Sequence, residues 1–153
     1  MNARCTVTLK NLLSELERMS GIVQAFGARH ALPAKVVFAV NLALDEVLTN
    51  IMSYGYDDGR PHDIVVRLSL GAGALVVEAE DDGRPFNPLA VAEPRTDQPL
   101  AERPVGGLGL HLVRNVMDDL EYRRQGDRNV LVMRKSIVDK LTITGCESLH
   151  RRR

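Results

Sequence analysis

The chain has 153 residues, 44% of them hydrophobic and 26% charged, the balance of a globular protein with room for one domain. Twenty basic residues balance 20 acidic ones, so no net field favours nucleic acid or an anionic membrane. The sequence shows neither a stretch near the roughly 18 apolar residues of a membrane span nor a hydrophobic signal region, and two cysteines make no disulfide framework. We expect a cytoplasmic protein without nucleic-acid or membrane partners, with one domain over residues 1–135 and a tail over 136–153.

The N-terminal part predicts one strand followed by two helices. Residues Cys5–Leu9 alternate enough for a short strand. From Leu12 to about His30, apolar residues recur at helical spacing. The face that they form comprises Leu12, Leu13, Leu16, Met19, Val23 and Phe26. Pro33 then suits the first turn of a second helix, from about Ala34 to Ser53.

The second helix is apolar nearly all round. Between Val36 and Tyr56 the only charged residues are Asp45 and Glu46, and such a helix is normally buried on several sides. One apolar stripe comprises Val37, Val40, Leu44, Val47, Leu48 and Ile51, and the nearly opposite face carries Ala39, Ala43, Glu46 and Asn50. We therefore expect Glu46 and Asn50 to face a cleft.

A hairpin is predicted next. Residues Ile64–Leu70 and Leu75–Asp81 alternate as two strands, and Gly71-Ala72-Gly73 joins them. In the second strand, Asp81 continues the row of alternate apolar residues that would face the core. A carboxylate in that row is costly to bury without a partner.

The remaining elements complete a layered domain. The segment from Pro85 to Val105 holds five of the seven prolines and one short helical turn near Leu89–Ala92, and so long a loop is usually functional or disordered. A helix then follows the glycines of 106–109, and a last hairpin joins Leu120–Arg124 to Val130–Met133. The inward residues of that helix are predicted to be Leu112, Val113, Val116 and Met117. The sum predicts an α+β two-layer sandwich, with helices on one face of a mainly antiparallel sheet.

Three groups of residues carry candidate chemistry, and each alone has a structural alternative. The Glu46 carboxylate can accept a proton and the Asn50 amide oxygen suits Mg²⁺, but the two also make an ordinary polar pair on a solvated face. Asp81 can accept a hydrogen bond from an exocyclic amine such as that of adenine, or belong to a strand-ending turn. The glycines of 106–109 bring backbone N–H groups close to a phosphate, or form a hinge for the loop.

The order of these groups is more specific than any one of them. Glu-x-x-x-Asn on a helix, Asp-x-Gly ending a strand, a long loop and Gly-x-Gly opening a helix resemble the gyrase/histidine-kinase/mismatch-repair ATPase superfamily. Within it, Glu46-Val-Leu-Thr-Asn50, Gly55-Tyr56 and Val116-Met117-Asp118-Asp119 are similar to the bacterial anti-sigma-factor serine/threonine kinases. The resemblance covers about residues 4–135. It implies a Bergerat-type ATP-binding fold, with three main helices on one face of a mixed, mainly antiparallel sheet.

The resemblance also implies roles for the matching residues. Glu46 would be the general base on a serine hydroxyl of a partner protein, and Asn50 would ligate Mg²⁺. Asp81 would bind adenine, with Gly83 and Pro85 in the turn beside it. The 88–105 segment would be the lid over ATP, and the protein a homodimer that binds a sigma factor and phosphorylates an antagonist protein. The phosphates would lie on Gly106, Gly107, Leu108, Gly109 and Leu110.

Departures from the family pattern keep other functions open. Pro85 stands where the second glycine of Asp-x-Gly-x-Gly is usual, and it stiffens the chain. Arg128-Asn129 replaces the Gly-Thr pair of the last hairpin, so the threonine contact to the adenine site is missing. One alternative is therefore a nucleotide-gated binding module without phosphotransfer. Another is the detached catalytic domain of a histidine kinase, whose phospho-accepting histidine would lie on a separate chain.

Overall fold

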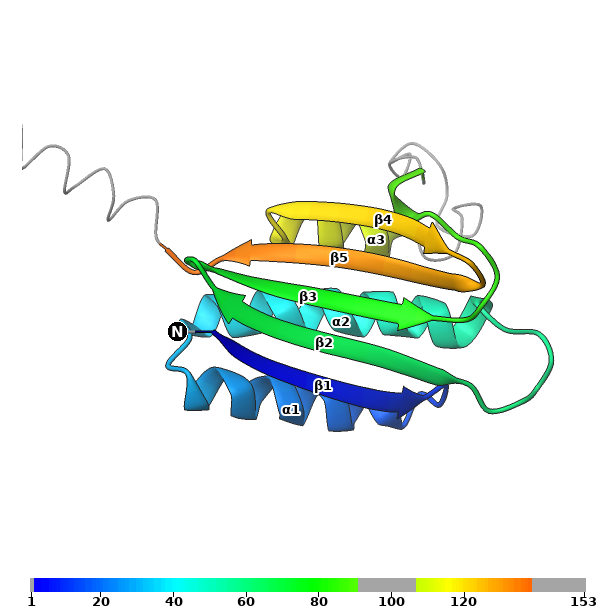
Figure 1. The fold of residues 1–153 in the computed structure, drawn as a ribbon, viewed down its shortest axis with the longest axis horizontal. Coiled ribbons are helices and arrows are strands. Elements are labelled where there is room, and N and C mark those ends of the chain that lie inside the picture. Colours follow the sequence, from blue (N-terminus) through cyan, green and yellow to red (C-terminus); the bar gives the residue numbers. More distant parts are fainter. Residues whose placement is uncertain (1, 91–106, 139–153) are drawn as a thin grey trace, which may run out of the picture.

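The computed structural model describes residues 2–90 and 107–138, with the backbone alone for residues 107–109 (Figure 1). Every helix and strand predicted from the sequence is present, with ends shifted by up to three residues. The short turn predicted near Leu89–Ala92 lies at Pro88–Ala90. In chain order the elements are β1 (Ala3–Lys10), α1 (Glu15–Arg29), α2 (Ala34–Tyr54), β2 (Asp63–Gly71), β3 (Ala74–Asp81), the 3₁₀ turn η1 (Pro88–Ala90), α3 (Gly107–Val116), β4 (Asp119–Gln125) and β5 (Arg128–Ser136).

The strands of the described part form one sheet in the order β1-β2-β3-β5-β4. All four pairings are antiparallel, which confirms the α+β class. The expectation of a mixed sheet is wrong for the described strands, because each strand runs opposite to its neighbours. Because β3 is the central strand, Asp81 at its end lies at one end of the sheet, midway between the two edge strands. In the register of β3 with β5, the residue opposite Asp81 is Asn129.

The turn between β2 and β3 has the geometry of a tight hairpin. Gly71 pairs with Ala74, which leaves two residues in the turn. Ala72 and Gly73 both have positive φ, at 50° and 77°. Two consecutive left-handed residues match the right-handed twist of the flanking strands, which is why a glycine is favoured here.

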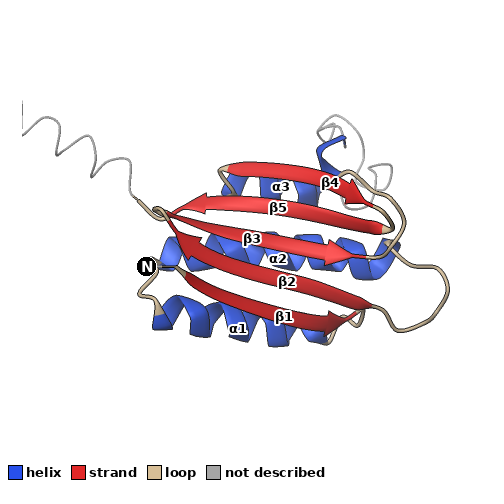
Figure 2. Cartoon of the chain, in the orientation of Figure 1, coloured by secondary structure: helices blue, strands red, loops and turns tan. Residues whose placement is uncertain are grey.

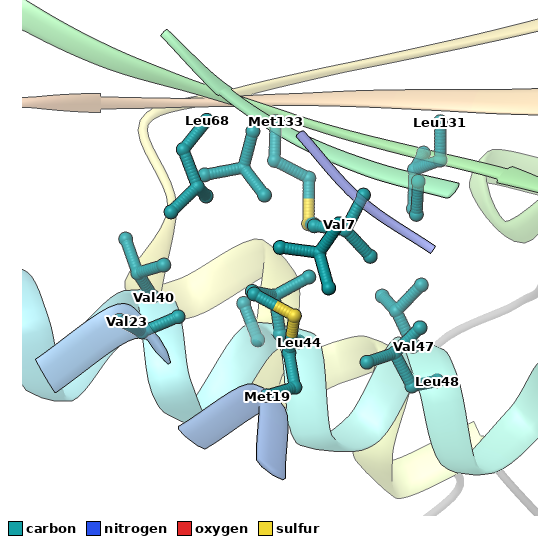
Figure 3. Close-up of a cluster of buried hydrophobic side chains, with 14 of the residues drawn as sticks. Val7, Met19, Val23, Val40, Leu44, Val47, Leu48, Leu68, Leu131 and Met133 are labelled. Carbon is teal, nitrogen blue, oxygen red and sulfur yellow. The ribbon is translucent and has the colours of Figure 1, made fainter. Parts of the chain in front are cut away.

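The helices lie on one face of the sheet (Figure 2), and α2 contacts both α1 and α3. Apolar side chains from the sheet and from the helices fill the space between the two layers. Burying each of the larger side chains contributes about 1.5–3 kcal/mol to the stability of the fold. Figure 3 shows part of this core, with Val7, Met19, Val23, Val40, Leu44, Val47, Leu48, Leu68, Leu131 and Met133. The central position of α2 explains why it is apolar nearly all round.

Two expectations about inward residues are wrong. Leu112 is 42% exposed, whereas Leu110, two residues earlier, is 6% exposed and packs inward together with Val113. The helical register places Leu110 and Val113 on the same face, and Leu112 points away from it. Leu12 and Leu13 are each 58% exposed, because α1 begins only at Glu15 and they precede its inward face.

By length and composition alone, α2 is also apolar enough to cross a membrane, with 39% of its most apolar window buried inside the protein. In the described fold its apolar residues pack in the protein core. Val40, Leu44 and Leu48 are each at most 2% exposed, against the sheet and α1. A helix at the centre of a core passes the same hydropathy test as a membrane span.

Candidate nucleotide-binding site

Candidate site residues collect where α2 and β3 end. The Gly55 N–H donates to the Ile51 carbonyl at 2.9 Å and closes the last turn of α2. The Gly55 carbonyl in turn accepts the Arg84 N–H at 3.0 Å. This backbone bond joins the Asn50 end of α2 to the turn that follows Asp81, although the two segments are distant in sequence.

Asp81 lies on the inward row, as predicted, and is only 4% exposed. Its Oδ1 accepts two hydrogen bonds, from the Gly83 N–H at 2.9 Å and from Asn129 Nδ2 at 3.0 Å. Burial raises the pKa of Asp81, while these two donors and the Arg124 guanidinium lower it in part and Asp82 raises it further. Oδ1 of the carboxylate therefore has two partners, whereas no hydrogen bond to Oδ2 is made within the described residues.

Gly83 is required by close packing rather than by backbone conformation. A Cβ added there would lie 2.7 Å from the Gly55 carbonyl oxygen and 2.9 Å from Asp81 Oδ1. Real Cβ atoms do not approach other atoms so closely. Only glycine therefore lets the turn lie against both the end of α2 and the Asp81 carboxylate.

Asn129 is the residue of the candidate site whose contacts the sequence did not predict. It is 6% exposed, and its Nδ2 donates to Asp81 Oδ1 and, at 2.8 Å, to the Arg84 carbonyl. Its Oδ1 accepts from the Tyr122 hydroxyl at 2.6 Å and from the Phe86 N–H at 3.4 Å. The position where the family threonine is missing therefore holds a side chain that touches both neighbours of Pro85. Only the β3–β5 register, which the sequence does not state, reveals this contact.

Glu46 and Asn50 lie one helical turn apart on α2, and both are partly buried. Ala39 and Ala43, on the same face, are 5% and 0% exposed, so this face does turn toward the protein. Asn50 Nδ2 is buried without a hydrogen-bond partner within the described residues. The Glu46 carboxylate likewise has no partner in that part of the chain. An unpartnered buried N–H donor is costly, so Asn50 Nδ2 is suited to a ligand atom that accepts a hydrogen bond, and a metal ion would instead take Oδ1.

The glycine segment opens a helix, as predicted, since α3 begins at Gly107. Gly106 lies outside the described residues. The first N–H groups of a helix have no partner within it and carry a positive partial charge, so this end of α3 suits an anion. The Leu110 side chain is buried in the core, which leaves its backbone for any contact with a ligand.

The start of the expected lid is fastened to α3. Arg114 Nη2 donates to the Pro88 carbonyl at 3.1 Å and to the Leu89 carbonyl at 2.6 Å. These bonds tie η1 to the helix that the glycines open. Residues 91–105 of the expected lid lie outside the described residues.

A second cluster, also without a sequence prediction, surrounds His62. Its ring stacks on Tyr56 with centroids 4.1 Å apart and planes 12° apart. His62 Nε2 lies 2.8 Å from Asp58 Oδ2, and Nδ1 lies 3.2 Å from Asp82 Oδ1. The hydrogen bond to Asp58 and the nearby Asp82 raise the pKa of His62. Burial and the charges of Asp81 and Asp82 raise the pKa of Tyr56, so its hydroxyl stays neutral.

These residues fit a magnesium nucleotide. The described residues include no group of three or more His, Cys, Asp or Glu side chains that could hold a metal ion. Mg²⁺ bound to a nucleotide takes most of its ligands from phosphates and water and needs only one or two from the protein. Asn50 could supply one of them, and an acceptor such as Asp81 suits an amino group on the base. The arrangement defines a nucleotide-binding domain of the ATPase type.

The comparisons with known proteins agree with this class. Residues 9–135 match the family model described as the histidine kinase-like ATPase domain. Over 100 residues the chain is 30% identical to the serine/threonine-protein kinase BtrW of Bordetella bronchiseptica, covering 65% of this chain and 70% of that protein. The chain therefore belongs to the histidine kinase-like ATPase family, and within it to the anti-sigma-factor serine/threonine kinases that its motifs resemble.

Two solved structures share the fold. The RsbU and RsbW domains of Rv1364c from Mycobacterium tuberculosis match with a TM-score of 0.65 at 12% identity, over 88% of this chain. The blue-light activated histidine kinase EL346 of Erythrobacter litoralis matches with a TM-score of 0.55 at 22% identity, over 86% of this chain. This chain spans 32% of the first structure and 43% of the second. At such identities the likeness concerns the fold alone.

Proposed function

We propose that the protein is an ATP-dependent serine kinase that transfers the γ-phosphate of ATP to a serine of an antagonist protein. The antagonist and a sigma factor would be its alternative partners in a partner-switching system. The observation that carries the proposal is the Glu46 carboxylate, which has no partner in the described part of the chain and lies one turn from the unpartnered Asn50 amide. The relative that is named a serine/threonine-protein kinase supports the reaction class.

Each candidate residue has a distinct task in this reaction. Glu46 would accept the proton of the serine hydroxyl while the serine oxygen bonds to the γ-phosphorus and the bond from that phosphorus to ADP breaks. Asp81 would orient the base, and the backbone N–H groups at the start of α3 would face the phosphates. Asn50 Oδ1 would hold Mg²⁺, which when bound neutralises phosphate charge.

Three further expectations belong to the same proposal. The protein would act as a homodimer in the cytoplasm, as the family resemblance implies. The ATP-binding domain would comprise residues 1–135, with 136–153 as an extension; β5 itself ends at Ser136. Light scattering on the full chain would measure the oligomeric state directly.

The decisive experiment compares two neighbouring carboxylates on α2. The purified protein is incubated with γ-labelled Mg-ATP and candidate antagonists encoded beside its gene. Glu46→Ala should bind ATP normally but lose at least about 100-fold in transfer, the contribution of a general base. Asp45→Ala is the matched control, because Asp45 is exposed and directly precedes Glu46 in the helix. Unchanged transfer by Glu46→Ala would refute the assigned role.

The product also separates the alternatives. Phosphate on serine is stable in acid, whereas an acid-labile product would indicate histidine phosphorylation. Tight ATP binding by the wild-type protein without any labelled product would indicate a nucleotide-gated binding module. Absence of ATP binding would refute all three.

A further inference from the structure

The side-chain amide of Asn129 has no hydrogen-bonding capacity left for a ligand. An amide offers two N–H donors and two lone pairs on its oxygen. The donors go to Asp81 Oδ1 and to the Arg84 carbonyl, and the lone pairs accept from Tyr122 and Phe86. With all four positions used and only 6% of the residue exposed, Asn129 acts through Asp81 rather than on a ligand.

The orientation of this amide is fixed by the chemistry of its partners. The Phe86 backbone N–H can only donate, so it faces Oδ1. The Arg84 carbonyl can only accept, so it faces Nδ2. Turning the amide over would break both bonds. A donor is therefore always directed at Asp81.

This fixed donor decides which oxygen of Asp81 remains for a ligand. Oδ1 already accepts from Asn129 Nδ2 and from the Gly83 N–H, which fills its two in-plane lone pairs. Within the described residues no hydrogen bond is made to Oδ2. An ionised carboxylate has only acceptors, so Oδ2 selects a donor and disfavours another acceptor.

We infer that Asn129 is a positioning residue for base recognition, which holds Asp81 Oδ1 so that Oδ2 reads the 6-amino group of adenine and rejects a 6-oxo purine. The inference rests on the proposed nucleotide binding and adds to it the base preference of the site. The base preference would depend on the protonation state and the orientation of the Asp81 carboxyl group. A protonated Oδ2 would instead donate a hydrogen bond to the 6-oxo group, and a 6-oxo purine could then bind.

The groups around Asp81 set how this preference depends on pH. Asp82, which follows it, raises its pKa, and Arg124 on β4 lowers it. Tyr56, which follows α2, is partly buried near Asp81, and burial together with the Asp81 charge raises its pKa, so its hydroxyl stays neutral. Burial raises the pKa most, and the Asn129 amide is the largest opposing influence. Loss of this donor therefore shifts the loss of adenine preference to higher pH.

A matched pair of variants tests the inference. Asn129→Thr and Asn129→Val have nearly the same shape, and both suit a strand, but only threonine can donate to Asp81. The affinities for ATP and for inosine triphosphate, which carries a 6-oxo group, are measured by calorimetry from about pH 5 to pH 8. Wild type and Asn129→Thr should prefer ATP. In Asn129→Val the ratio of the two affinities should fall about tenfold, the loss expected for one hydrogen bond to a charged group.

A titration without nucleotide makes the test independent of binding. The pKa of Asp81, followed by carbon NMR of its carboxyl group, should be higher in Asn129→Val than in Asn129→Thr. Equal pKa values or equal affinity ratios in the two folded variants would overturn the inference, as would a wild type that binds both nucleotides equally well. A wild type that binds neither nucleotide refutes the proposed function, and the titration then still decides whether Asn129 controls Asp81.

Discussion

Replacing Gly83 by alanine adds a single methyl group at the point where α2, β3 and the candidate base site meet. The new Cβ would lie 2.7 Å from the Gly55 carbonyl oxygen and 2.9 Å from Asp81 Oδ1. Neither atom is the free end of a flexible side chain, because Gly55 accepts the Arg84 N–H and Asp81 is held by two donors. The turn must therefore move away from the helix or lose these bonds.

The cost follows from this geometry. Overpacking by one methyl group costs about 1–3 kcal/mol, and the free energy of unfolding should fall by that amount. For a domain of this size the melting temperature should fall by about 4 °C per kcal/mol. Displacement of Asp81 should also weaken ATP binding by about tenfold, the value of one hydrogen bond to a charged group.

A second glycine supplies the matched control. Gly21 lies in the middle of α1, and an added Cβ meets nothing within 4 Å. Gly21→Ala should stabilise the protein by up to about 1 kcal/mol through helix propensity, with unchanged ATP affinity. Thermal unfolding and calorimetry with ATP measure both effects. If Gly83→Ala melted and bound ATP like the wild-type protein, the close-packing account of this turn would be wrong.

Three other predictions follow from the site and the core. Asp81→Asn replaces one carboxylate oxygen by a donor, so ATP affinity should fall by about tenfold or more; undiminished affinity by calorimetry would count against the adenine pocket. The raised pKa of His62 stabilises the fold below its ordinary value of 6.5, and this contribution should be lost as pH rises through the raised value. Melting temperatures of His62→Gln should therefore vary less between about pH 6 and pH 8 than those of the wild type. Leu68→Ala, at a fully buried position, should cost about 2–5 kcal/mol in urea denaturation, and a cost as small as that of exposed Leu12→Ala would contradict the core described.

Much of the fold could be predicted because its elements have strong local signals. The alternation in β3 placed Asp81 inward, and the structure has it 4% exposed. The nearly uncharged run of α2 indicated a helix buried on several sides, and α2 contacts the sheet, α1 and α3. Gly71-Ala72-Gly73 predicted the hairpin, whose two turn residues have positive φ. In each case the signal lies within a few consecutive residues.

Other features depend on contacts between distant segments, and the sequence pattern did not give them. Leu112 was placed inward because it is apolar, but only the packing of α3 decides that Leu110 takes that position. The stack of His62 on Tyr56 joins two points of a loop that has no periodicity. The roles of Glu46, Asn50 and the glycine segment are still predictions from family resemblance.

What the sequence determined by itself is the set of elements, the fold class and the carboxylate at the end of β3. These follow from the period of apolar residues, which is fixed by the local geometry of helices and strands. Only the tertiary structure decided how that carboxylate is held. The β3–β5 register sets Asn129 opposite Asp81, and a register is chosen by the burial of whole strand faces rather than by the residues at one position. An asparagine that looked in the sequence like a lost threonine contact is, in the fold, the partner that fixes Asp81.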